Sequence, residues 1–217
     1  MPDLRLFRLM ISGMPTPKPG SGPRQPVFRP AIGAGIVVVL VLLLQVGGED
    51  VGPFLRYDRG PIEGGQLWRL VTAHLVHLGW GHAIVNATAL ALIVAAFGPV
   101  LRPVQWLWVA VTSALVVDAG LWFVHPAVHW YAGLSGVLHG LVAAAAVATR
   151  SAMPRLSAAI LCFLSGKLLW EFVAGPLPLT SEMAGTNVIT QAHFWGATGG
   201  TLAALVVTRR HRRSDPL

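Results

Sequence analysis

Residues 130–149 read WYAGLSGVLHGLVAAAAVAT. From Gly136 onwards the stretch is small, apolar and helix-forming, which is the composition of a helix that lies in lipid. Near its start, however, Ser135 stands between two glycines, and His139 follows one helical turn later. Polar residues inside a membrane are costly and tend to mark function. The fold and the function of the chain both depend on what surrounds this serine.

The composition favours a membrane protein that crosses the bilayer several times. The 217 residues are 54% hydrophobic and only 12% charged, which is about half the charged content of a soluble domain. The net charge of +7 lies mainly in the two tails, where it indicates topology signals and contacts with anionic lipids. We therefore expect membrane lipids, and no nucleic acid, among the partners. A single cysteine, Cys162, excludes a disulfide framework, and its apolar neighbours predict a buried side chain.

Six apolar segments predict an all-α bundle of six transmembrane helices. Each segment is long enough, or nearly so, to cross a hydrocarbon core of ~30 Å at about 1.5 Å per residue. The bundle forms one domain over residues 30–208. It follows a disordered cytoplasmic tail at 1–29, which is rich in Pro, Gly and Arg, and precedes a basic cytoplasmic tail at 209–217. The six segments are 31–47, 82–101, 104–124, 133–149, 156–174 and 188–208.

The basic residues predict how the bundle is oriented. With the N-terminus in the cytoplasm, 12 of the 16 basic residues fall on the inner side, as the positive-inside rule requires. They occupy both tails and the two connections that hold Arg102, Arg150 and Arg155. Both termini are therefore expected in the cytoplasm. The first outer connection, roughly 48–81, contains an amphipathic stretch that we expect to lie in the membrane interface.

Polar residues on four of the predicted helices fall at one depth. Asn86, Ser135, Glu171 and His193 each lie 15 or 16 residues from the arginine at the inner end of the same helix. At a rise of 1.5 Å per residue, all four are about 22 to 24 Å above the inner face. The spacing thus predicts a single site, in the outer half of the bilayer, to which four helices contribute.

The residue types at this depth indicate nucleophilic catalysis. A serine and a histidine on different helices can form a nucleophile and its general base, here Ser135 and His193. Glycines beside the serine allow close backbone approach and leave its N–H free to donate. His82 and Asn86, four residues apart on one helix face, are suitably placed to stabilise an oxyanion.

Other polar residues have a structural interpretation as well as a functional one. Lys167 and Glu171, at i and i+4, predict an ion pair, and recognition of a polar substrate end by Glu171 is the alternative. His139 is either a structural contact or a modulator of catalysis. Asp118 has no evident partner. Because neither acid is evidently placed to orient a histidine, the pattern favours a Ser–His dyad over a full triad.

Two further histidines, His74 and His77, precede His82 closely enough to suggest a metal site. We favour hydrogen bonds from both rings to the loop backbone, and expect neither a metal nor a cofactor. Gly196 and Gly200, four residues apart, predict close packing of the last segment against the segment that holds the serine.

Together these motifs resemble the rhomboid family of intramembrane serine proteases, and the resemblance covers residues 31–208. Where many rhomboids have a tyrosine four residues after the serine, this chain has His139. The resemblance implies that Ser135 is the nucleophile and His193 the general base, with an oxyanion hole formed by the Ser135 N–H, His82 and Asn86. The matching motifs are Trp68-Arg69, His77, HAIVN at 82–86, GLSG at 133–136 and AHFWGATGG at 192–200.

Within this family the chain is most similar to rhombosortases, on the basis of its minimal six-helix core, YAGLSGVLHG, and KLLWE followed by VITQAH. This implies a bacterial inner-membrane enzyme whose site opens to the periplasm. Its substrates would be exported proteins with a C-terminal GlyGly-type tail, formed by a glycine-rich motif, a hydrophobic helix and a basic end. The residues leave other readings open: a rhomboid protease for other single-span proteins, a non-catalytic binder of membrane clients, or a histidine-rich haem or metal protein.

Overall fold

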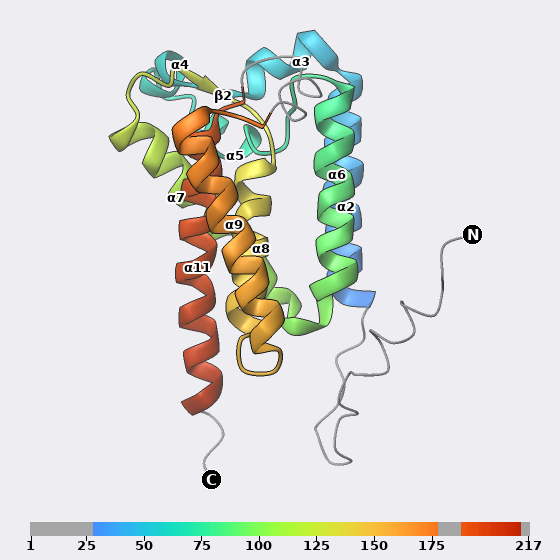
Figure 1. Ribbon diagram of the computed structural model, residues 1–217. Coiled ribbons are helices and arrows are strands. Elements are labelled where there is room, and N and C mark those ends of the chain that lie inside the picture. Colours follow the sequence, from blue (N-terminus) through green and yellow to red (C-terminus); the bar gives the residue numbers. More distant parts are fainter. Residues whose placement is uncertain (1–27, 178–187, 214–217) are drawn as a thin grey trace, which may run out of the picture.

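The computed structural model describes residues 28–177 and 188–213, and over these residues the protein is a bundle of long helices with most of its short elements at one end (Figure 1). The long helices are α2 (Phe28–Val46), α6 (Trp80–Phe97), α7 (Pro103–Ala119), α8 (Ser135–Thr149), α9 (Pro154–Ala174) and α11 (Thr190–Arg213). The short elements are α3 (Gly48–Leu55), α4 (Arg59–Glu63), α5 (Arg69–Thr72), the 3-10 turn η1 (Gly98–Val100), the π-helical turn η2 (Gly120–Val124), and the strands β1 (Tyr57–Asp58) and β2 (Trp130–Tyr131).

Helix α8 occupies the centre of the bundle, where it packs against α6, α7, α9 and α11. Its run of four alanines, 143–146, is at most 1% exposed. Glycines bring α11 against it: a Cβ at Gly196 would overlap the carbonyl of Gly136, and one at Gly200 would overlap the carbonyl of Gly140. The close packing predicted for Gly196 and Gly200 is therefore present, because small residues let two helix backbones approach.

The outer surface of the bundle is strongly apolar. Among the described residues, three helices are long and apolar enough to cross a membrane: Trp80–Val100, Pro103–Val124 and Pro154–Ala174. Large apolar side chains such as Phe163 and Phe172, 73% and 88% exposed, cover the outside of α9. A water-soluble monomer rarely exposes so much apolar surface, and the chain is accordingly a multi-pass membrane protein. Two more apolar helices are shorter, Pro30–Val46 and Ser135–Thr149, so six spans and their orientation remain predictions.

The helix boundaries differ from the predicted ones mainly at the two ends. Helix α11 continues to Arg213, through the first part of the predicted basic tail, because arginine is a good helix former. Helix α2 begins at Phe28, inside the predicted N-terminal tail. The rest of that tail, 1–27, and residues 214–217 lie outside the described residues.

Cys162 is exposed on α9 rather than buried, because an apolar neighbourhood in a membrane protein includes the face toward lipid.

The first outer connection folds into α3, β1, α4 and α5, and two arginines hold it in place. Arg69 donates from Nη1 to the carbonyls of Pro53 and Arg56, at 2.8 and 2.9 Å. Arg59 donates from Nη2 to two carbonyls of η2, at 2.9 and 3.0 Å. Strand β1 pairs antiparallel with β2, and Tyr57 lies opposite Tyr131. The chain that leads into Ser135 is therefore anchored to this connection.

Candidate active site

Ser135 lies at the first position of α8, two residues later than the predicted start of this helix. Gly133 has φ +128°, a conformation that L side chains rarely adopt, and it turns the chain into the helix. A Cβ at Gly133 would also lie only 2.7 Å from Cε1 of His82, so the glycine lets the histidine ring approach. Because Ser135 begins the helix, its backbone N–H has no carbonyl partner within α8.

Buried side chains fix the turn before Ser135. The Tyr131 hydroxyl donates to the carbonyl of Gly133, and burial raises the pKa of this hydroxyl, which therefore stays protonated as a donor. The N–H of Leu134 donates to Nε2 of His77 at 3.3 Å. Burial, and secondly the neighbouring His82, lower the pKa of His77 to about 3, so the ring is neutral and Nε2 can accept. The sequence did not single out Tyr131, since nothing in the pattern distinguishes it from an ordinary buried aromatic residue.

A chain of hydrogen bonds runs through four polar residues from three helices. The Ser135 hydroxyl Oγ lies 3.0 Å from Nε2 of His193. On the other side of the ring, Nδ1 of His193 donates to Oε2 of Glu171 at 2.9 Å. Lys167 Nζ then donates to Oε1 of Glu171 at 2.6 Å. His193 and Glu171 are 3% and 4% exposed, so these contacts are shielded from solvent.

This chain contains the expected Lys167–Glu171 pair and one contact that the sequence did not predict. Glu171 binds His193, where the sequence favoured a histidine without a carboxylate partner. The arrangement has the order of a catalytic triad: an acid holds Nδ1–H of the imidazole, and Nε2 is left to accept the proton of the serine.

His139 stacks on one face of the His193 ring. The two imidazoles stack with their centroids 4.1 Å apart and an interplanar angle of 13°. Nδ1 of His139 donates to the Ser135 carbonyl at 2.7 Å. In the described part of the chain, His139, Glu171 and His193 are close enough together to hold a metal ion. However, parallel rings do not direct their lone pairs to one point, and both nitrogens of His193 have hydrogen-bond partners, so the contacts fit ring support better than metal ligation.

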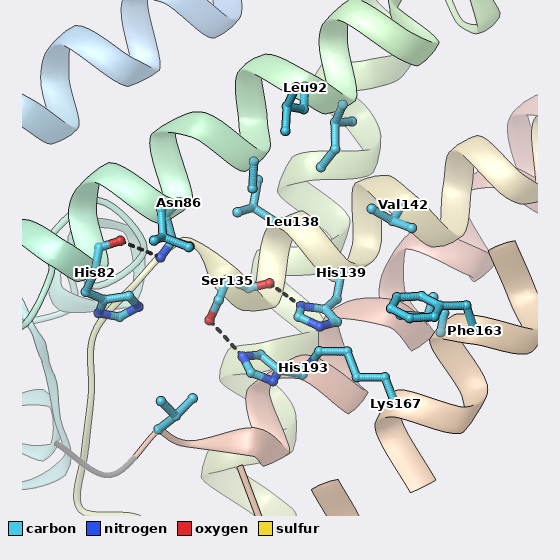
Figure 2. A pocket seen from close by; sticks show the side chains of 15 residues that line it. His82, Asn86, Leu92, Ser135, Leu138, His139, Val142, Phe163, Lys167 and His193 are labelled. Carbon is cyan, nitrogen blue, oxygen red and sulfur yellow. Dashed lines mark hydrogen bonds between the residues drawn. The ribbon is translucent and has the colours of Figure 1, made fainter. Parts of the chain in front are cut away.

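His82 and Asn86 face the serine from α6, as Figure 2 shows, with His139 and Lys167 on its other side. Asn86 Nδ2 donates one hydrogen to the His82 carbonyl at 2.8 Å, and its second hydrogen has no partner in the described part of the chain. Among the described residues, Asn86 Oδ1 and His82 Nδ1 are buried without a hydrogen-bond partner. Both side chains border a cavity of about 400 Å³. Its lining includes Val85, Leu92, Ile93, Ser135, Leu138, Val142, Phe163, Leu164, Lys167 and His193.

A second buried pair lies outside this cavity. His74 Nε2 is 3.3 Å from Oδ1 of Asp118, and both side chains are buried. The rings of His74 and Tyr131 also pack in a T-shaped arrangement, with centroids 5.6 Å apart. Asp118, for which the sequence suggested no partner, thus pairs with a histidine of the outer connection. Of the two loop histidines, His74 contacts Asp118, and His77 accepts from the backbone N–H of Leu134.

Comparisons with known proteins agree with this architecture. Residues 64–210 match the protein family described as Rhomboid domain. The chain is also similar to a protein of Bacillus subtilis (strain 168) named "Putative rhomboid protease YdcA", with 27% identity over 162 residues, which cover 72% of this chain and 75% of the relative. The matched family region includes each residue of the hydrogen-bonded chain and of the cavity.

Proposed function

The chain belongs to the rhomboid family, and from this premise we propose that it is an intramembrane serine endopeptidase of the rhombosortase type. The observation that carries the proposal is the 3.0 Å contact between Ser135 Oγ and His193 Nε2 beside an apolar cavity. A serine is a weak nucleophile alone and needs an adjacent base, which this contact provides.

In the proposed reaction His193 Nε2 takes the hydroxyl proton as Ser135 Oγ attacks the carbonyl carbon of the scissile bond. The tetrahedral intermediate then collapses, and His193 donates the proton to the leaving amine. The acyl group remains on Ser135 until water, deprotonated by the same imidazole, attacks the ester. His193 thus acts first as general base, then as general acid, in each half of the reaction.

The oxyanion formed in each half-reaction needs donors aimed at it. We assign this role to the Ser135 N–H, His82 and Asn86. The assignment is supported by the start of α8 at Ser135, which leaves the amide without an intrahelical partner. It is also supported by the position of His82 and Asn86 on the wall of the same cavity, where Asn86 retains one free N–H.

The cavity is suited to an unwound segment of a membrane-anchored substrate. Its lining is mostly aliphatic, so a substrate segment could pass from lipid to Ser135 without exposing apolar surface to water. A helix must unwind before its backbone reaches the serine, and glycine lowers this cost because it has the poorest helix propensity of the ordinary residues. A C-terminal tail with a hydrophobic helix and a glycine-rich motif suits the apolar lining and also unwinds at low cost.

The proposed setting is a bacterial inner membrane crossed six times, with both termini in the cytoplasm and the site open to the periplasm. The distribution of basic residues supports this orientation. Arg102, Arg150 and Arg155 lie at the helix ends remote from Ser135, on the same side as the basic end of α11 (Figure 1). The fifteen residues of α8 span about 22 Å, less than a hydrocarbon core, so a water path to the serine from the outer side is short.

The test is cleavage in proteoliposomes that contain the full-length chain. One substrate carries a C-terminal tail with a glycine pair, a hydrophobic helix and a basic end, and the matched control has leucines in place of the glycine pair. We expect the wild type to cut the glycine tail alone, and Ser135→Ala to cut neither. Cleavage by Ser135→Ala would exclude the serine as nucleophile. Equal cleavage of both tails would instead indicate a general rhomboid protease, and binding without cleavage by the folded wild type a client-binding protein.

A further inference from the structure

We propose that Glu171 is a positioning residue that fixes the proton of His193 on Nδ1, and that Lys167 in turn fixes the carboxylate. The inference rests on the proposed function, because it concerns how His193 acts as a base. It adds Glu171 and Lys167 to the Ser135–His193 dyad, so that four residues form one chain of hydrogen bonds.

The geometry determines which nitrogen of His193 carries the proton. A carboxylate only accepts hydrogen bonds, so the 2.9 Å contact with Oε2 requires a hydrogen on Nδ1. In the neutral ring Nε2 then bears the lone pair, and it points at Ser135 Oγ, 3.0 Å away. When Nε2 takes the serine proton, the ring becomes a cation that rests against an anion. Glu171 stays ionised throughout, and no proton passes to it.

Lys167 makes an ionised carboxylate tolerable at this place. Glu171 is 4% exposed, and a buried anion without a partner is strongly disfavoured. The ammonium of Lys167 donates to Oε1 at 2.6 Å and leaves Oε2 for His193. Because Lys167 borders the cavity, it also reaches the space that a substrate would occupy.

An alternative is that Lys167 and Glu171 form only a structural ion pair, and the Gln variant distinguishes the two readings. In Glu171→Gln the amide oxygen satisfies the Lys167 ammonium, because that contact is charge-assisted and the stronger of the two. The amide NH₂ then faces His193 Nδ1, which must accept and move its proton to Nε2. The imidazole would then present a hydrogen, and not a lone pair, to the serine. A structural role predicts no such effect, since Gln keeps the size and most of the packing.

The experiment measures the rate of Ser135 labelling by a fluorophosphonate probe, as a saturable process that separates the maximal rate from the probe affinity. We expect the maximal rate to fall by about 10³-fold or more in Glu171→Gln, with unchanged affinity. Glu171→Ala, in which neither tautomer of the His193 ring is imposed by a neighbour, should label faster than Glu171→Gln.

The Lys167 variants test the second half of the proposal. Adding Lys167→Met to Glu171→Gln should increase the rate, because the amide oxygen is released to face His193. Lys167→Met alone should decrease it, and Glu171→Asp should restore part of the activity.

Asp118→Asn is the matched control, because it makes the same carboxylate-to-amide change at the other buried histidine–carboxylate pair. It should label within about threefold of the wild type, and thermal unfolding in detergent shows whether each variant is folded. Labelling of Glu171→Gln within threefold of the wild type would overturn the inference. So would equal rates in folded Glu171→Gln and Glu171→Ala, or a further loss on adding Lys167→Met. A folded wild type that neither labels nor cleaves substrate would instead overturn the proposed function.

Discussion

Two buried histidine–carboxylate pairs lie among the described residues, and they differ both in their own contact and in their surroundings. His193 and Glu171 are 2.9 Å apart, and His74 and Asp118 are 3.3 Å apart. In the first pair the second ring nitrogen faces a serine, and a lysine holds the carboxylate. In the second, neither ring nitrogen of His74 makes a hydrogen bond with the described residues.

The cavities beside the two pairs differ in the same way. His193 borders the 400 Å³ cavity that Ser135 also faces. Asp118 borders a separate cavity of about 360 Å³, lined over the described residues by Ile62, Glu63, Leu67, Leu70, Leu115, Ala119, Trp122 and Phe123, with no serine, cysteine or histidine. Of these two pairs, only the first thus has a serine and a cavity beside its histidine. The second joins the outer connection to α7.

The largest expected effect separates the two histidines. His193→Asn removes the base, and the rate of fluorophosphonate labelling should fall by about 10³-fold or more. His74→Asn should leave that rate within about threefold, because His74 does not border the cavity of Ser135. The measurement is a time course of probe incorporation for both variants at equal concentrations of folded protein. Comparable losses in the two variants would show that the outer pair also takes part in catalysis.

The second prediction concerns what the outer pair contributes to stability. Asp118→Leu removes the carboxylate that lies 3.3 Å from the buried imidazole of His74, and we expect the free energy of unfolding to fall by about 3 kcal/mol. Replacing both members, in Asp118→Leu with His74→Leu, should recover at least half of this loss, because no polar group is then stranded. Unfolding by SDS in mixed micelles measures both quantities. A double variant as unstable as the sum of the two single variants would argue against a direct pair.

A pH dependence of stability is expected from His77, which supports the turn before Ser135. Its pKa is about 3 in the folded protein and 6.5 in the unfolded chain, so the unfolded state binds the extra proton as the pH falls. The stability present above pH 6.5 should therefore decrease toward pH 5, by about 2 kcal/mol from this residue. His77→Gln retains an acceptor for the Leu134 N–H and should lose this part of the slope. An identical slope in both proteins would assign the dependence to other groups.

The smallest effect is expected at His139, which stacks on the His193 ring. His139→Phe keeps an aromatic face there and should label within about threefold of the wild type. His139→Ala removes that face, and we expect labelling to be about fivefold slower, in line with the ~1 kcal/mol typical of an aromatic contact. If instead Phe were as slow as Ala, the bond from His139 Nδ1 to the Ser135 carbonyl would matter more than the stack.

The sequence assigned the site residues one common depth, which stays a prediction, but it did not show which side chains meet. Counting residues from the inner arginines placed Asn86, Ser135, Glu171 and His193 at one level, since the helical rise is constant. It gave no rotation of one helix relative to the next, and that rotation decides whether Glu171 faces His193. The contact was missed for this reason, although Lys167 and Glu171 were correctly assigned to one helix face.

The partners contributed by the outer connection were the hardest to predict. The contact between Asp118 and His74 and the hydrogen bond from the Leu134 N–H to His77 both depend on the fold of the outer connection. In this connection α3, β1, α4 and α5 fold over the end of the bundle. These elements are two to eight residues long, and hydrophobic periodicity does not resolve elements of that length. Composition and motifs predicted the helical bundle itself. A long apolar segment in a membrane must satisfy its backbone hydrogen bonds internally, and a helix does so.

The most direct test of the central claim is to locate the residue that the fluorophosphonate probe modifies. The full-length protein in mild detergent is labelled and digested, and the adduct is assigned by mass spectrometry. We predict an adduct on Ser135 that is absent from both Ser135→Ala and His193→Ala. Labelling that survives Ser135→Ala, or an adduct on another residue of a folded and proteolytically active protein, would contradict the claim that Ser135 is the nucleophile activated by His193.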